Sequence, residues 1–194
     1  MKYRGPILFL SGVVAALAVG WFLFPVALYR TEPQPLSFNH RIHTDQGGMS
    51  CDMCHEFASD GRFKGIPTVA KCAECHATPV GTTDAEKRLV EEYITPGREI
   101  PWKVYSRQPD NAFFSHATHV MAGKLECPVC HGPHGIDTTL HPYQVNRITG
   151  YSRDIWGPNI SGIPSQPWQG MKMDRCIRCH TERDRVDGCV ACHK

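Results

Sequence analysis

The chain has 194 residues, a formal charge of +2 and a hydrophobic fraction of 41%. This length accommodates one or two domains and excludes a large multidomain protein. Apart from one N-terminal stretch, the sequence contains no apolar run long enough to cross a membrane, which argues against a protein with many spans.

The N-terminal stretch, residues 6–29, carries no charged side chain. As a helix it would be about 36 Å long, enough to cross a hydrocarbon core of about 30 Å. A cleaved signal peptide is the alternative, because the segment 16–18 (Ala-Leu-Ala) resembles a cleavage site. The apolar run continues to residue 29, however, and Trp21 and Tyr29 suit a membrane interface. We therefore predict a cytoplasmic terminus (1–5) and a retained transmembrane anchor (6–29).

A short linker, 30–37, with two prolines is predicted to follow the anchor. A repeat comes next, in which Phe-x-His-x-x-His precedes a cysteine by seven residues. The first copy holds His40 and His43, and the second holds His116 and His119. We read the chain beyond the linker as two modules, 38–95 and 96–194, each containing one copy of the repeat.

All ten cysteines occur in C-x-x-C-H motifs, the attachment signature of c-type haem. The two thiols of each motif reach the vinyl groups of one porphyrin, and the following histidine ligates the iron from below. Two motifs lie in the first module and three in the second. We predict five covalently bound haems c, attached through Cys51 and Cys54, Cys72 and Cys75, Cys127 and Cys130, Cys176 and Cys179, and Cys189 and Cys192, with proximal ligands His55, His76, His131, His180 and His193.

Between and after these motifs the sequence predicts little regular structure. Residues 84–93 carry Leu89, Val90 and Tyr93 among charges, which indicates a short amphipathic helix. Residues 96–114 are expected to be extended, with Trp102, Val104 and Tyr105 as packing anchors. The long segment 135–170 is rich in glycine, proline and aromatic residues, among them Tyr143, Tyr151, Trp156 and Trp168. Such a segment is expected either to contact haem faces or a partner, or simply to wrap the haems.

About 33 residues of the segment 31–194 serve each haem (164/5), so porphyrins are expected to form most of the core. The predicted fold class is mainly α plus coil, a multihaem cytochrome c with one N-terminal transmembrane helix.

Six histidines lie outside the motifs and exceed the five distal positions to be filled. This surplus favours irons closed on both sides, as in electron carriers, over an open haem catalyst. Two imidazoles from one turn cannot easily serve one iron, so each pair should serve two haems. We expect His40 on the haem of Cys51 and Cys54, His116 on that of Cys127 and Cys130, and His43 and His119 on haems attached elsewhere. The fifth haem would take Met173, His134 or His141, and no catalytic residue is predicted.

The haem propionates change the charge balance. With all of them ionised, the protein would carry about −3 when oxidised and about −8 when reduced. A basic electron-transfer partner fits this charge, and no nucleic-acid partner is expected. Because bacterial c-type haems are attached outside the cytoplasm, residues 31–194 are predicted to lie in the periplasm, anchored to the inner membrane.

The repeat and motifs resemble class III multihaem cytochromes c. The stretches GIPTVAKCAECH, IPWKVYSRQPDNAFFSHATH and NRITGYSRD and the closely spaced final motifs are more specifically similar to the cytochrome c subunit of menaquinone reductase (Qrc) complexes. They are also similar to the pentahaem subunit of alternative complex III. Qrc cytochrome subunits are described with six haems, whereas this chain has cysteines for five.

The resemblance implies a complex with iron–sulfur, molybdopterin-like and integral membrane quinone-binding subunits. In a menaquinone reductase, this subunit would relay electrons from a soluble periplasmic multihaem cytochrome toward menaquinone. In alternative complex III, electrons would flow from quinol instead. Two further alternatives are a stand-alone membrane quinol dehydrogenase and a self-sufficient pentahaem reductase. The latter is disfavoured because all five motifs are standard and the periplasmic part is small.

Overall fold

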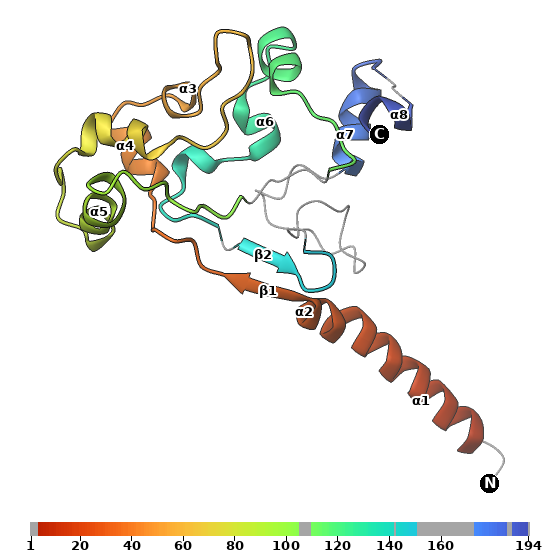
Figure 1. Ribbon diagram of the computed structural model, residues 1–194. Helices are drawn as coiled ribbons and strands as arrows, with labels where there is room; N and C mark the ends of the chain where they lie inside the picture. Colours follow the sequence, from red (N-terminus) through yellow and green to blue (C-terminus); the bar gives the residue numbers. More distant parts are fainter. Residues whose placement is uncertain (1–3, 105–109, 142, 151–172, 186–187, 194) are drawn as a thin grey trace.

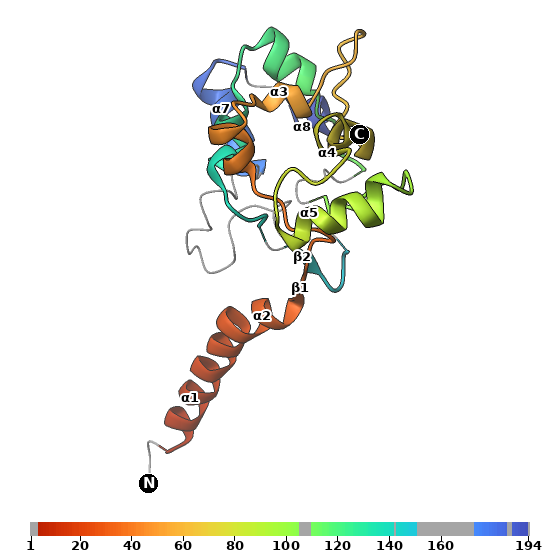
Figure 2. The same ribbon diagram turned by 90° about the vertical axis from the view of Figure 1, so that its left-hand side faces the viewer.

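The computed structural model describes residues 4–104, 110–141, 143–150, 173–185 and 188–193. The chain begins with a long helical rod that projects away from the body (Figures 1 and 2). The rod consists of α1 (Arg4–Ala18), a π-helical turn η1 (Val19–Leu23) and α2 (Phe24–Leu28). Pro25 cannot donate a backbone hydrogen bond, which accounts for the irregular turn that precedes it.

Residues Arg4–Leu23 form a span of 20 residues with a mean hydropathy of 2.2, none of it buried in the protein. The helix reaches Leu28, and Tyr29 adopts an extended conformation, so the helical part of the predicted span ends one residue early. The predicted linker then differs from the structure, because it opens as strand β1 (Tyr29–Glu32). This strand pairs antiparallel with β2 (Tyr143–Asn146). An ion pair between Glu32 and Lys103 also ties the base of the rod to the body.

The first half of the body contains five helical elements: η2 (Ile42–Gln46), α3 (Cys51–Cys54), α4 (Val69–His76), α5 (Asp84–Arg88) and η3 (Leu89–Ile94). The last two form the predicted helix 84–93, which begins where the Thr83 hydroxyl accepts the Glu86 amide. A small apolar cluster of Leu36, Val69, Tyr93 and Ile100 holds α4 against η3, and Trp102 packs on it. The cluster therefore takes residues from both sides of the predicted module boundary at residue 95.

The second half contains η4 (Ala117–Ala122), α6 (Cys127–His131), a 3₁₀ turn η5 (His134–Ile136), α7 (Met173–Glu182) and α8 (Cys189–Cys192). In α6, α7 and α8 no described residue is buried. Figure 1 shows α4 and α5 at one side of the body, α6 in the middle, and α7 and α8 at the other side. Tyr105, Tyr151, Trp156, Trp168 and Met171 lie outside the described residues. The mainly helical and coil fold predicted from the sequence is confirmed.

Candidate haem sites

The two copies of the repeat fold in the same way. Phe38 stacks on His43 at 4.5 Å and meets His40 edge-on at 4.8 Å between ring centroids. In the second copy Phe114 stacks on His119 at 4.4 Å and meets His116 edge-on at 4.9 Å. One phenylalanine thus holds two imidazoles at a large angle to each other, so that each can face a different haem.

The second histidine of each copy, His43 or His119, also makes a hydrogen bond to a backbone carbonyl. The Nδ1 atom of His43 lies 2.7 Å from the Asn39 carbonyl oxygen, and that of His119 lies 2.8 Å from the Ser115 carbonyl oxygen. Since a carbonyl accepts only, Nδ1 donates in both cases and Nε2 is left as the ligating atom.

A glycine follows each second histidine by four residues. An added Cβ at Gly47 or Gly123 would lie 2.6 Å from the carbonyl oxygen of His43 or His119. The tight π-helical turns therefore require glycine at both positions. Aligning the two repeats reveals this shared glycine, which our sequence analysis missed.

Three of the predicted distal histidines face a proximal histidine across a similar gap. The ring centroids are 6.1 Å apart for His43 and His76, and 6.3 Å apart for His116 and His131. For His119 and His180 they are 6.0 Å apart. These distances allow a direct test of whether a haem iron would fit between the rings.

An imidazole nitrogen binds a first-row metal at about 2 Å, so the centroids of two imidazoles on opposite sides of one metal lie roughly 6 Å apart. All three pairs match this separation, and each includes the histidine of a different C-x-x-C-H motif. The separation of the rings therefore fits haem irons held from both faces.

His40 lies in a different arrangement. Its ring centroid is 6.5 Å from that of His134, while the His55 ring stacks at 6.4 Å on Phe63. Burial, together with the nearby imidazoles of His134 and His55, lowers the pKa of His40 to about 4. The Nδ1 atom of His40 is buried without a hydrogen-bond partner among the described residues. Within that part of the chain, the structure does not bring His40 and His55 into a ring pair like the other three.

The two candidate histidines for the fifth haem lie together. His134 Nδ1 and His141 Nε2 are 3.2 Å and 2.9 Å from the Asp137 carboxylate, and their ring centroids are 4.6 Å apart. Burial and His141 lower the pKa of His134 against the opposing effect of Asp137. With Nδ1 on the carboxylate, Nε2 is the nitrogen of His134 that could ligate a metal.

The third candidate, Met173, is the first residue of α7 and is 55% exposed. The fifth motif lies beside the start of the second repeat, because Phe113 donates its amide to the Cys192 carbonyl oxygen at 2.7 Å. His193 forms an isolated β-bridge with Ala112.

The ten cysteines form no disulfides, and several thiols of different motifs are neighbours. Burial raises the pKa of the Cys127 thiol, and Cys51, which hydrogen-bonds to it, raises it further. Burial likewise raises the pKa of Cys72, with Cys54 adding to the shift. In the third and fourth motifs, burial raises the pKa values of the Cys130 and Cys176 thiols. The neighbouring Cys179 raises the pKa of Cys130 further, and Cys130 and Cys192 raise the pKa of Cys176 further.

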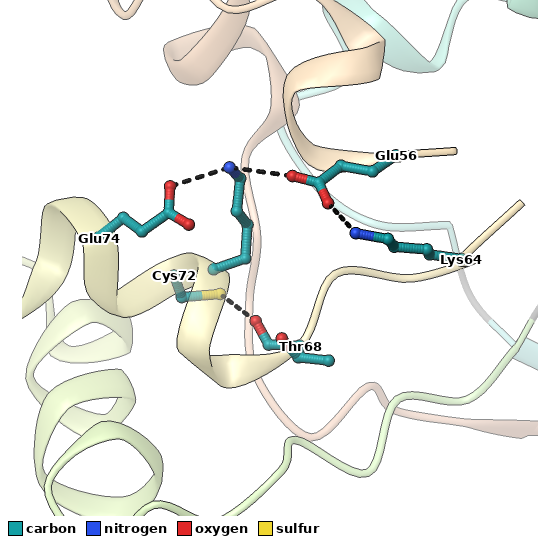
Figure 3. A network of polar contacts seen from close by, with 6 residues as sticks. Glu56, Lys64, Thr68, Cys72 and Glu74 are labelled. Carbon is teal, nitrogen blue, oxygen red and sulfur yellow. Dashed lines mark hydrogen bonds and ion pairs between the residues drawn. The ribbon is translucent and has the colours of Figure 1, made fainter. Parts of the chain in front are cut away.

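Around α4 a chain of ion pairs connects the first two motifs (Figure 3). Lys71 lies 3.1 Å from Glu56 and 2.9 Å from Glu74, and Glu56 also pairs with Lys64 at 2.7 Å. The hydrogen bonds of Lys71 to Glu74 and Glu56 raise its pKa, so it remains charged. Because Glu56 follows His55 and Lys71 precedes Cys72, the network fixes the second motif against the first.

His76 is bound by a carboxylate. Its Nδ1 atom lies 2.9 Å from Glu86 Oε1. Burial raises the pKa of Glu86, but hydrogen bonds from the Val80 amide, His76 and the Gly81 amide outweigh it and lower the pKa overall. The carboxylate is therefore ionised at neutral pH. Glu86 was not among the sequence-predicted site residues, and the only pattern that marks it is the Thr-x-x-Glu helix start at Thr83, which does not point to a ligand.

The fold and this set of thiols and imidazoles define a multihaem cytochrome c. The Class III cytochrome C family matches residues 26–96. Over 201 aligned positions the chain is 37% identical to the menaquinone reductase multihaem cytochrome c subunit of Nitratidesulfovibrio vulgaris, covering 96% of this chain and 89% of the relative. The chain therefore belongs to the family of that cytochrome c subunit, a family of electron-transfer proteins, and the resemblance predicted from the sequence is confirmed.

Proposed function

We propose that this chain is the electron-relay subunit of a menaquinone reductase complex, and that it carries electrons along five covalent haems. The observation that carries the proposal is the set of opposed histidine pairs at 6.0–6.3 Å. A haem closed on both faces exchanges electrons and leaves no open position for substrate. The 37% identity to a menaquinone reductase subunit supports the same assignment.

We number the haems 1 to 5 in the order of their motifs along the chain. The ring pairs support His43 as the distal ligand of haem 2, His116 of haem 3 and His119 of haem 4. His40 remains the proposed distal ligand of haem 1, since its Nδ1 atom is buried and His55 lies near enough to lower its pKa. Met173, His134 and His141 remain the candidates for haem 5.

The same contacts support a single file of haems in the order 2, 1, 3, 4, 5. The network of Lys71 and Glu56 connects the motifs of haems 2 and 1. Phe63 lies between His55 and His116, at 6.4 Å and 4.2 Å, and so connects haems 1 and 3.

Haem 3 is connected to haem 4 because their distal ligands, His116 and His119, share one turn. The neighbouring thiols Cys176 and Cys192 connect haems 4 and 5. The file agrees with the positions of α4, α6, α7 and α8 across the body in Figure 1.

The relay acts outside the cytoplasm and has no catalytic site of its own. We propose that the apolar helix is retained as a single anchor in the bacterial inner membrane and that the haem-bearing part lies in the periplasm. One helix cannot enclose a quinone, so the quinone site belongs to an integral membrane subunit. Iron–sulfur and molybdopterin-like subunits complete the complex, and a soluble periplasmic multihaem cytochrome supplies the electrons.

Affinity purification of the intact chain from detergent-solubilised membranes tests this function. We expect it to bring down the other subunits, to contain five haems per chain, and to pass electrons from a soluble multihaem cytochrome to a menaquinone analogue. The separated subunit should still be reduced by the soluble cytochrome but should not reduce the quinone. Quinone reduction by the isolated subunit, or a mature N-terminus near Val19 in a soluble form, would contradict the proposal.

A further inference from the structure

The His76 imidazole differs from the predicted haem ligands His43, His55 and His119 in the group that accepts its Nδ1 proton. Backbone carbonyl oxygens of Asn39, Gly65 and Ser115 accept from His43, His55 and His119. For His76 the acceptor is the Glu86 carboxylate, at 2.9 Å. Haem 2 would therefore have a neutral partner on its distal imidazole and a charged one on its proximal imidazole.

The carboxylate of Glu86 is held in place by its own loop. The Val80 amide donates to Oε1 at 2.6 Å, and the Gly81 amide donates to Oε2 at 2.7 Å. The Thr83 hydroxyl accepts the Glu86 amide at 3.2 Å and so sets the start of α5.

Space at the site is also limited. A Cβ added at Gly81 would lie 2.6 Å from Glu86 Oε2, and the Glu86 side chain is 12% exposed. The loop is thus shaped around the carboxylate, and Glu86 can hold the ring orientation of His76.

A carboxylate that accepts from the outer nitrogen of a metal-bound imidazole makes that imidazole a stronger donor. A stronger axial donor stabilises ferric over ferrous iron and lowers the reduction potential of the haem. No proton or bond needs to be exchanged for this effect, because the charge acts through the hydrogen bond.

We propose that Glu86 is a positioning residue that lowers the potential of haem 2 below the potentials of haems 1 and 4, whose ligands His55 and His119 bond to backbone carbonyls. This inference rests on the proposed electron relay and on the place of haem 2 at one end of the file. A low-potential haem at an end favours electrons moving inward from it. The surface of α4 and α5 is then the face at which the soluble cytochrome delivers electrons.

The test uses the full haem-loaded chain in detergent, with each haem followed by EPR during a redox titration. Glu86→Gln removes the charge while keeping an acceptor oxygen. Glu99→Gln is the matched control, because Glu99 caps α4 through the Val69 amide at 2.9 Å without touching an imidazole in the described contacts.

We expect Glu86→Gln to raise the potential of one haem by about 59 mV, a tenfold change in its reduction equilibrium. Glu99 lies near Cys72 of the same motif but bonds to no imidazole in the described contacts, so Glu99→Gln should shift that potential much less. Five unchanged potentials in Glu86→Gln would overturn the proposal, as would an equal shift in Glu99→Gln.

A measurement on the unaltered chain keeps the test decisive if Glu86→Gln loses haem. In the fully reduced, diamagnetic protein with ¹⁵N-labelled histidine, we expect the Nδ1 proton of His76 farther downfield than those of His43, His55 and His119, which are bonded to carbonyls. Equivalent shifts for all of them would overturn the proposal. Either failure would leave quinone reduction by the complex intact, so it is distinguishable from a failure of the proposed function.

Discussion

The two copies of the repeat have the same local geometry but different surroundings. The first copy, with Phe38 and His43, lies beside the apolar cluster that joins α4 to η3. The second copy, with Phe114 and His119, leads into α6, where no described residue is buried. The arrangement of the phenylalanine and histidine rings is therefore set by the repeat itself. The packing that stabilises the surrounding helices differs between the two modules.

The physical reason is the supply of apolar side chains. Val69 and Tyr93 bury themselves without any cofactor, whereas Ile177 in α7 is 58% exposed in the polypeptide alone. A helix that exposes its apolar residues requires another surface to pack on, and the haem attached to it provides that surface. The second module should accordingly depend on its haems more than the first.

Production of the chain without haem attachment should show the largest difference between the modules. We expect amide hydrogen exchange to lose all protection in 114–131 and 173–193, while 69–94 keeps part of it, because the apolar cluster remains. The haem-loaded chain serves as the control. Equal exchange in both modules of the haem-free chain would show that the cluster is too small to matter.

Tyr93→Ala should destabilise the first module of the haem-loaded protein by about 3 kcal/mol, since it empties the centre of the cluster. Denaturant unfolding followed by circular dichroism measures the change. Ile148→Ala is the control, because Ile148 is 78% exposed, and it should change stability by less than about 0.5 kcal/mol. Similar losses for both would refute the idea that the cluster stabilises this module.

Replacing His43 or His119 with Met tests whether the two copies work alike. Each change should raise the potential of one haem by on the order of 0.1 V and leave the others near their original values, because a thioether favours ferrous iron. EPR-monitored titration should assign His43→Met to haem 2 and His119→Met to haem 4. Unchanged potentials and unchanged low-spin spectra in both variants would rule out these ligands.

The smallest expected effect concerns the base of the rod. The hydrogen bond from Lys103 lowers the pKa of Glu32 from its ordinary value of 4.5, although burial opposes this. Since the folded pKa is the lower one, the stabilisation is present above pH 4.5 and is lost as the pH falls through the folded value.

Glu32→Gln should therefore lower the melting temperature slightly at pH 7 and by less as the pH falls below 4.5, with a smaller difference in high salt. Lys103→Met should have the same effect, and the double variant should add nothing to it. Additive losses in the double variant would show that the pair does not interact.

Removal of the apolar helix should release a soluble haem-loaded protein, provided that the cut leaves β1 intact. A cut after residue 30 removes half of β1, whose Tyr29 pairs with Asn146. A soluble haem-loaded chain should therefore begin before Tyr29.

The sequence by itself determined the local features of this protein. The C-x-x-C-H motifs, the duplicated histidine pairs, the apolar N-terminal helix and the short helix at 84–93 follow from spacing and periodicity within a few residues. Gly47 and Gly123 belong with them, because aligning the two repeats is enough to find both.

Only the tertiary structure decided which distant residues meet. Four contacts join segments that are separated along the chain. They are the opposed rings of His43 and His76, the opposed rings of His119 and His180, the strand pairing of Tyr29 with Asn146, and the contact of Glu86 with His76. Local spacing cannot encode such contacts, because they depend on how loops close and how helices pack. Glu86 shows this most clearly, since in the sequence it is one acidic residue in an exposed amphipathic helix.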